Sequence, residues 1–305
     1  MFSTIVVGVD GLQGGRDALH FAQSLCERAG GALVAVHIYP DEPFALRGLR
    51  LDIEAVARDE ADTLLRRQLA AAGVSARGIV TADTSRGRGL HRAAKDLDAD
   101  VLVVGSSHRG PAGRVLAGDN VRAVLSGAAC PVVVATHQAG EAQLGELVIG
   151  IGYDGSLASR EALAWGGRLA EAVDGSVRVI CTVDAADRFA PSVSYGFNWV
   201  GRVPESEEHA KSMVAKAVAD IGERASGQVV VSRAGNALPR LSRGLDLLVL
   251  GSDGYGPVRR TLLGSTSDRL VHSAACPVVV VPPGTSRRDA HVNAATDAKA
   301  GNANR

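Results

Sequence analysis

Residues 251 to 265 read GSDGYGPVRRTLLGS, a glycine-rich stretch with hydroxyl side chains at its end. It follows the apolar run LDLLVL and precedes a segment with a helical pattern. Glycines lack a Cβ atom, so they allow positive φ angles and the close approach of a ligand to the backbone. A helix start offers free N–H groups and the positive end of its dipole, which together favour phosphate. The spacing G-x2-G-x9-G-S predicts a phosphate-binding loop at Gly251, Gly254, Gly264 and Ser265.

Each of these residues also has a purely structural interpretation. Glycines after a strand often serve only the turn, and a serine at a helix start is often only an N-cap. The combination of this spacing with Asp154-Gly155-Ser156 at the end of an earlier strand is more specific than any single residue.

The chain contains one unit written twice. The segment AACPVVV at 128–134 reappears at 274–280, an offset of 146, and residues 105–119 nearly copy the glycine-rich stretch. We therefore predict two duplicated domains, a linker and a disordered tail. Their boundaries are expected at 1–137, 138–145 (linker), 146–283 and 284–305 (tail).

Each half alternates apolar, strand-like runs with helical patterns. In the second half the strands are expected near 146–153, 176–183, 228–232, 245–250 and 276–281. Strands that are almost entirely apolar, with helices between them, indicate a parallel sheet covered on both faces. The predicted fold class is α/β, with two tandem, open, Rossmann-like sheets of five strands in the order 3-2-1-4-5, each sandwiched by helices. The fifth strands are sheet edges, so we expect them to pair antiparallel and join the halves as an internal pseudo-dimer.

A binding crevice is expected where the strand order reverses, between the first and fourth strands. In the second half Asp154 ends the first strand and Gly251 ends the fourth, so the two should face each other. The Asp154 carboxylate is placed to accept hydrogen bonds from a ribose or to orient a phosphate-bound metal ion.

These motifs resemble the universal stress proteins, whose nucleotide motif is G-x2-G-x9-G-[ST]. The resemblance extends over nearly the whole chain, and it implies a regulator of stress adaptation or growth that binds ATP, with or without Mg²⁺. It implies that Asp154 contacts the ribose or adenine, that the Val183 backbone meets the adenine, and that the loop holds the phosphates. The candidate residues are Tyr153, Asp154, Val183, Gly251, Ser252, Gly254, Gly264, Ser265, Thr266 and Ser267.

The first half departs from the motif. It keeps Asp10, Gly105 and Gly118, but His108 stands where the second half has Gly254, and Asp119 stands where it has Ser265. Positive φ costs a non-glycine residue roughly 1–2 kcal/mol, and a carboxylate at a helix start repels phosphate, although it is also a good helix cap. We expect this first site to be weak or lost.

Composition excludes several classes of protein. The 33 basic and 33 acidic residues balance, which removes the electrostatic argument for a nucleic-acid or acidic-membrane partner. No run approaches the roughly 18 apolar residues that span a bilayer, and the four cysteines form no CxxC pair. We expect a soluble cytoplasmic protein without a metal site or a catalytic constellation.

Other interpretations stay open. GIGYDG at 150–155 satisfies the dinucleotide pattern G-x-G-x-x-G, but two of its glycines fall inside a strand run. The alternatives are therefore a slow ATP hydrolase, a dinucleotide-dependent enzyme, and an interaction scaffold without nucleotide. The preferred hypothesis is a protein with at most weak ATP hydrolysis and an unknown regulatory protein partner, existing as a homodimer or an internal pseudo-dimer. The aromatic-rich segment 184–204 is either a binding surface or packing for its own domain.

Overall fold

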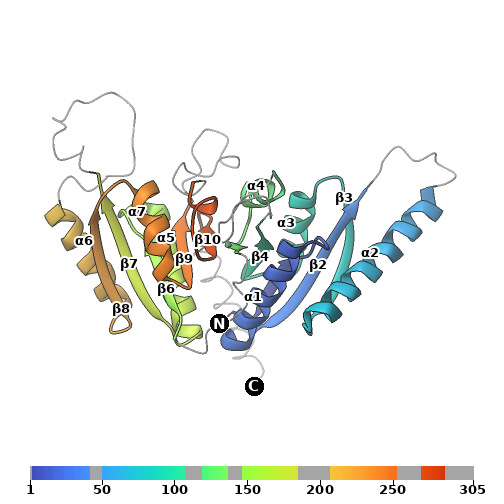
Figure 1. Ribbon diagram of the computed structural model, residues 1–305, viewed down its shortest axis with the longest axis horizontal. Helices are drawn as coiled ribbons and strands as arrows, with labels where there is room; N and C mark the ends of the chain where they lie inside the picture. Colours follow the sequence, from blue (N-terminus) through green and yellow to red (C-terminus); the bar gives the residue numbers. More distant parts are fainter. Residues whose placement is uncertain are drawn as a thin grey trace, which may run out of the picture.

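The computed structural model describes residues 2–41, 50–106, 119–136, 146–184, 207–252 and 269–285. Strands and helices alternate through both halves of the chain (Figure 1). The first half contains β1 (Thr4–Gly8), α1 (Gln13–Ala29), β2 (Ala32–Pro40), α2 (Arg50–Ala72), β3 (Arg77–Asp83), α3 (Arg86–Asp96), β4 (Val101–Gly105), α4 (Asp119–Leu125) and β5 (Val132–Ala135). The second half contains β6 (Val148–Gly152), α5 (Leu157–Ala172), β7 (Ser176–Val183), α6 (Glu207–Ile221), β8 (Ala225–Val231), α7 (Ala234–Leu241), η2 (Ser242–Gly244), β9 (Leu247–Gly251) and β10 (Val278–Val281).

The strands form one continuous sheet of ten, in the order β3-β2-β1-β4-β5-β10-β9-β6-β7-β8. Within each half all pairs are parallel and follow the predicted order 3-2-1-4-5, so the predicted fold class is confirmed. The halves meet where β5 and β10 pair antiparallel, with Val133 opposite Val279. The predicted pairing of the two fifth strands is therefore present, and it turns two open sheets into one.

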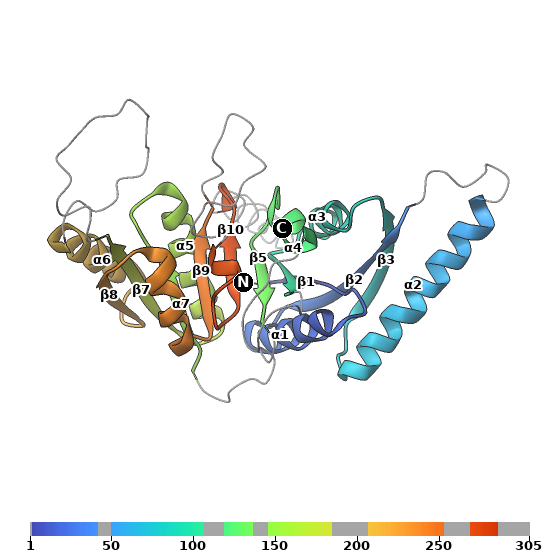
Figure 2. The same cartoon turned by 45° about the horizontal axis from the view of Figure 1, so that its top comes forward.

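The two faces of this sheet carry separate cores. Helices α1, α2, α5 and α6 cover one face, whose buried cluster runs without interruption through both halves. Helices α3, α4 and α7 cover the other face, which is likewise buried across the junction of β5 and β10, the two strands that lie side by side in Figure 2. Each half therefore packs against the other on both sides of the shared strands.

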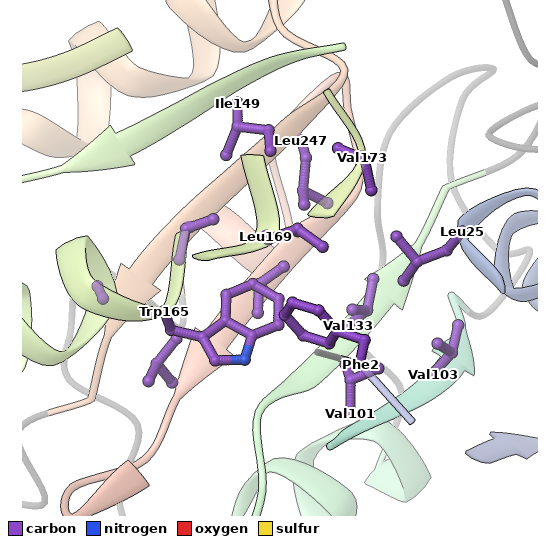
Figure 3. Close-up of a cluster of buried hydrophobic side chains, with 14 of the residues drawn as sticks. Phe2, Leu25, Val101, Val103, Val133, Ile149, Trp165, Leu169, Val173 and Leu247 are labelled. Atoms are coloured by element: carbon purple, nitrogen blue, oxygen red, sulfur yellow. The ribbon is translucent and has the colours of Figure 1, made fainter. Parts of the chain in front are cut away.

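An aromatic pair lies at the junction on the first face. The ring centroids of Phe2, which precedes β1, and Trp165 on α5 are 5.5 Å apart, and the rings meet edge to face at 88°. Trp165 is 2% exposed. Figure 3 shows the pair beside Leu25 of α1 and Val133 of β5. Such aromatic pairs contribute roughly 0.5–1.5 kcal/mol beyond the burial of their area, so this contact supports the strand pairing beneath it.

The element boundaries follow the sequence patterns closely. Helix α5 begins after Ser156, whose hydroxyl accepts a hydrogen bond from the Ser159 N–H, as an N-cap does. Helix α7 begins at Ala234, because its first turn closes on the Arg233 carbonyl. The linker, most of segment 184–204 and the tail beyond Thr285 lie outside the described residues.

Replacing Val279 by lysine tests the strand pairing. Val279 is fully buried between β5 and β9, so an unpaired ammonium there should lower the free energy of unfolding by roughly 3–5 kcal/mol and separate the halves. Chemical denaturation measures the first effect, and small-angle scattering measures the second as a larger radius of gyration. Val279→Ala is the control, with a smaller loss and an unchanged radius. A Val279→Lys protein with the parent's unfolding midpoint would contradict the assignment.

Candidate functional site

The carboxyl ends of β6 and β9 meet at one edge of the second half. The strands are parallel neighbours with Ile151 opposite Val249, and extending this register by two residues places Tyr153 level with Gly251. Asp154 and Ser252 follow directly. The strand order reverses at this point, since β7 lies on one side of β6 and β9 on the other. The structure thus brings the Asp154 turn and Gly251, the first glycine of the G-x2-G-x9-G-S motif, to the edge where a crevice is expected.

A tight turn fixes the Asp154 carboxylate. Its Oδ1 accepts a hydrogen bond of 3.0 Å from the Ser156 N–H, and Gly155 between them has φ +78°, which favours glycine. The first half repeats this turn, because Asp10 Oδ1 accepts a 3.0 Å bond from the Leu12 N–H and Gly11 has φ +80°. Both carboxylates are exposed at a strand end, where a ligand hydroxyl could reach them.

Val183 stands at the rim of the same edge. Gly152 at the end of β6 is opposite Ile180, so β7 runs three residues further before it ends at the buried Val183. Burial, together with the charge of Asp154, raises the pKa of the nearby Cys181 thiol to about 11. Cys181 is therefore a protonated packing residue near the turn rather than a nucleophile.

The structure describes only part of the predicted site. Tyr153, Asp154, Val183, Gly251 and Ser252 lie at one edge. The remaining candidates lie outside the described residues: Gly254, Gly264, Ser265, Thr266 and Ser267 in the second half, and His108 and Gly118 in the first. Asp119 is described as the first residue of α4.

One expectation for Gly251 is wrong. Its place in the glycine-rich motif predicts positive φ, but Gly251 is not among the positive-φ glycines of the described residues. A Cβ atom built on it would lie 2.2 Å from the backbone oxygen of Ala158 in α5. Gly105 of the first half is equally constrained, since its Cβ would lie 1.9 Å from the Gly14 oxygen in α1. These glycines allow a helix to pack closely on the end of the fourth strand.

The first half contains a small cavity of about 70 Å³ at the matching edge. Its walls are mainly apolar side chains of β2, α3, β4 and α4: Val36, Ile38, Leu90, Val104, Val121 and Val124. Asp10 and Gly105, two of the predicted first-half residues, also line it, and so does Arg86 at the start of α3. The crevice of the first half thus carries both an exposed carboxylate and an exposed guanidinium.

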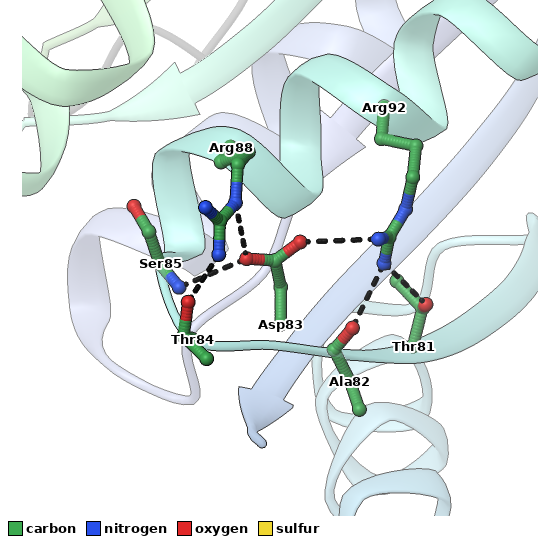
Figure 4. A network of polar contacts seen from close by, with 7 residues as sticks. All are labelled: Thr81, Ala82, Asp83, Thr84, Ser85, Arg88 and Arg92. Carbon is green, nitrogen blue, oxygen red and sulfur yellow. Dashed lines mark hydrogen bonds and ion pairs between the residues drawn. The ribbon is translucent and has the colours of Figure 1, made fainter. Parts of the chain in front are cut away.

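Sequence reasoning missed the arginines that follow β3. Asp83, whose side chain is 3% exposed, ends β3 and accepts hydrogen bonds from the Ser85 N–H (3.0 Å) and Arg88 Nε (2.9 Å), while Arg92 lies 3.2 Å away (Figure 4). Arg92 also donates to the Ala82 carbonyl, and Arg88 to the Thr84 hydroxyl. The signal was present in the run TSRGRGLHR, where arginines follow an acidic strand end at helical spacing.

Burial alone would raise the pKa of Asp83. The hydrogen bonds from Ser85 and Arg88 and the charges of Arg88 and Arg92 outweigh burial and hold this pKa below its ordinary value. The network fixes the strand end from which Arg86 begins the next helix, so it supports the wall of the first-half cavity.

Three further findings concern a metal site, a membrane span and the dinucleotide pattern. Within the described ranges, no group of three or more His, Cys, Asp or Glu residues could hold a metal ion. None of the helices in the described part of the chain has the length and apolar character needed to span a membrane. Gly150 and Gly152 of the dinucleotide pattern lie inside β6, where Cβ atoms would contact Leu245 and Leu250, so they serve packing rather than a phosphate turn.

Comparison with known proteins resolves the family. The sequence profile described as "Universal stress protein family" matches residues 1–136 and 148–282. The chain belongs to the universal stress protein family. A universal stress protein of Mycobacterium tuberculosis (strain ATCC 25618 / H37Rv) is 28% identical over 302 residues, covering 92% of this chain and 99% of its own.

Two further comparisons agree. A universal stress protein of Mycolicibacterium smegmatis is 33% identical over 193 residues, and the match spans only 61% of this chain and 62% of that relative. The crystal structure of a universal stress protein from Archaeoglobus fulgidus superposes with a TM-score of 0.67 at 17% identity, covering 93% of this chain and 100% of the other. This last likeness supports the fold alone.

Replacing Gly251 by alanine separates packing from ligand binding in this universal stress protein. The new Cβ would meet the Ala158 backbone, so we expect a loss of roughly 1–3 kcal/mol in the free energy of unfolding without any nucleotide present. Thermal unfolding of nucleotide-free protein is the measurement, and Gly105→Ala should behave alike. Unchanged stability combined with weaker nucleotide binding would instead restore the ligand-contact interpretation.

The Asp83 network predicts a dependence of stability on pH. Because the pKa of Asp83 is lowered on folding, its contribution is fully present above the ordinary value of about 3.9 and is lost as the pH falls through the lowered pKa. Asp83→Asn should cost roughly 1–2 kcal/mol at neutral pH, since both arginines are half exposed and remain solvated. Denaturation at neutral pH and at a series of lower pH values should show the stability difference between the parent and Asp83→Asn shrinking as the pH falls below about 3.9. A difference that is constant with pH would contradict this assignment.

Proposed function

We propose that this universal stress protein binds ATP in the crevice of its second half and acts as a regulator of stress adaptation or growth. The observation that carries the proposal is the position of the motif G-x2-G-x9-G-S, which begins at Gly251 on the same sheet edge as Asp154 and Val183. Family membership and the strand-order reversal at this edge both support it.

Each part of the crevice suits one part of the nucleotide. In the proposal the exposed Asp154 carboxylate accepts hydrogen bonds from the ribose hydroxyls, and the Val183 backbone meets the adenine. In the same proposal, the helix start that the sequence predicts after Gly264 would supply N–H donors and hydroxyls to the phosphates, where each charge-assisted hydrogen bond contributes roughly 1.5–3 kcal/mol. Mg²⁺, if bound, would be held mainly by phosphate oxygens with help from Asp154.

The mode of action in this proposal is a change of partner or shape rather than catalysis, in the cytoplasm. Two alternatives remain testable on the same protein, namely slow ATP hydrolysis and a scaffold without nucleotide. Mass spectrometry of protein purified without added nucleotide distinguishes them. Bound ATP supports the proposal, bound ADP favours a hydrolase, and protein that carries no nucleotide favours a scaffold.

Substituting Gly264 tests the position of the phosphates. Gly264→Glu should abolish ATP binding in isothermal titration calorimetry, because the new carboxylate would occupy the position of a phosphate group and repel its negative charge. The matched control is Gly118→Glu at the corresponding residue of the first half, which should leave binding unchanged. Equal affinity in the Gly264→Glu protein and the parent would place the site elsewhere.

The first half should bind ATP much more weakly than the second. His108 and Asp119 replace a motif glycine and a serine, so the double substitution His108→Gly with Asp119→Ser should raise the number of ATP molecules bound per chain toward two. Isothermal titration with ATP measures this number in the parent, in the Gly264→Glu protein and in the first-half double variant. A parent protein that already binds two equivalent ATP molecules would refute the weak first site.

A further inference from the structure

A surface groove runs between α5 and α6 on the second half, with a volume of about 680 Å³. One end lies at Tyr153, next to the Asp154 turn, and the other at Arg224 beyond the end of α6. Met213 lines the groove, and its sulfur is also the atom nearest to a Cβ built on Gly155. At the Tyr153 end, the groove is therefore lined by a side chain, Met213, that also packs against the turn of the candidate nucleotide site.

Two small residues of α5 open this groove. Ala164 and Gly167 line it, whereas the repeat offset of 144 places His20 and Gln23 at the matching positions of α1. A Cβ atom on Gly167 would lie 3.7 Å from Ile221 of α6, an ordinary contact distance. The groove is therefore open because residues 164 and 167 have small side chains, and close packing of the backbone does not require a glycine there. The first half has the larger side chains of His20 and Gln23 at the matching positions.

The charges along the groove are unbalanced. Four cations line it, namely Arg160, Arg168, Lys216 and Arg224, against two anions, Glu171 and Asp220. Arg224 is already engaged with Asp174 and the Gly175 carbonyl. In the described part of the chain, the side chains of Arg160 and Lys216 have no hydrogen-bond or ion-pair partner. This excess of positive charge stands out in a chain whose net charge is zero.

Apolar side chains form the floor between these charges. Leu163, Met213 and Ile221 line the groove together with the small residues of α5. From Arg160 to Glu171, helix α5 advances roughly 16 Å, the length of about three helical turns. A groove with an apolar floor and charged rims suits one face of an amphipathic helix, whose anchors recur at i, i+3, i+4 and i+7.

We propose that this groove docks an acidic amphipathic helix of a protein partner. Its apolar side chains would lie over the floor, and its carboxylates would meet Arg160, Arg168 and Lys216. The charge pattern argues for this occupant, because complementary charges steer association and reject segments of the opposite sign. The proposal does not depend on nucleotide binding, so its test is carried out on the full chain without added ATP.

The probe is a fluorescein-labelled peptide of roughly 16 residues, long enough to follow the groove. It carries leucine at i, i+3, i+4 and i+7 and glutamate at the flanking positions. A second peptide has lysine in place of every glutamate. Fluorescence anisotropy should show saturable binding of the acidic peptide to the parent protein and none of the basic peptide.

Two variants locate the binding. Lys216→Glu reverses one unpaired rim charge, and Gly167→Gln restores the side chain found in the first half and fills the floor; each should weaken binding by at least about tenfold. Glutamine is a better helix former than glycine and its Cβ fits, so Gly167→Gln should melt no lower than the parent. The matched control is Arg67→Glu on α2. Leu64 lies against the Gly11 turn as Met213 lies against the Gly155 turn, and Arg67 follows Leu64 by three residues as Lys216 follows Met213. Arg67 is therefore the residue of the first half that corresponds to Lys216. The control substitution should change the affinity less than about twofold.

Several outcomes would overturn the proposal. They are a folded parent that fails to bind the acidic peptide, equal binding of the basic peptide, and an Arg67→Glu protein as impaired as Lys216→Glu. Light scattering provides a further check: a parent that is a dimer, and that becomes monomeric on Gly167→Gln, would assign the groove to a second copy of this chain instead.

Discussion

The antiparallel pairing of β5 with β10 is the contact on which the rest of the structure depends. Each half ends in a short strand of four small apolar residues, Val132–Ala135 or Val278–Val281, that would otherwise be an unpaired sheet edge, a known site of aggregation. Pairing satisfies both backbones and merges two cores into continuous layers on either side of the sheet. The Phe2–Trp165 contact then adds packing over the junction, so the orientation of the halves is set by a buried interface rather than by the linker.

A second constraint comes from the close packing of helices on strand ends. Gly105 and Gly251 occupy equivalent positions, and each leaves space for the backbone of the helix that follows the first strand. The first glycine of the nucleotide motif is therefore needed by the fold whether or not a ligand is bound. The presence of this glycine therefore indicates the fold and not nucleotide binding. Whether a half keeps its nucleotide site depends on the later motif positions, where Gly254 and Ser265 of the second half correspond to His108 and Asp119 of the first.

Much of the fold could be predicted from the sequence because its signals are local and repeated. Apolar strands, the periodic face of α5 and the exact copy of AACPVVV predict the order of elements, and the unpaired edges predict how the halves join. Asp154, Val183 and Gly251 could be placed at one edge because parallel strands end together. The role of Gly251 could not be predicted, since it depends on how closely α5 approaches from a distant part of the chain. The Asp83 network was missed for a similar reason, because its importance lies in burial and not in spacing.

Covalent fusion of the halves has a consequence for how such a protein can change over evolution. In a symmetric assembly of two identical chains every substitution appears twice, so any feature gained on one side is imposed on the other. Here the two halves form one sheet, but each is encoded by its own part of the gene, so a substitution in one half does not appear in the other. They have already diverged. Ala164 and Gly167 line a groove in the second half where the first half has His20 and Gln23, and Arg86 lines the cavity of the first half. The pairing of β5 with β10 thus preserves the pseudo-symmetric sheet, while the outer surfaces of the two halves can specialise separately.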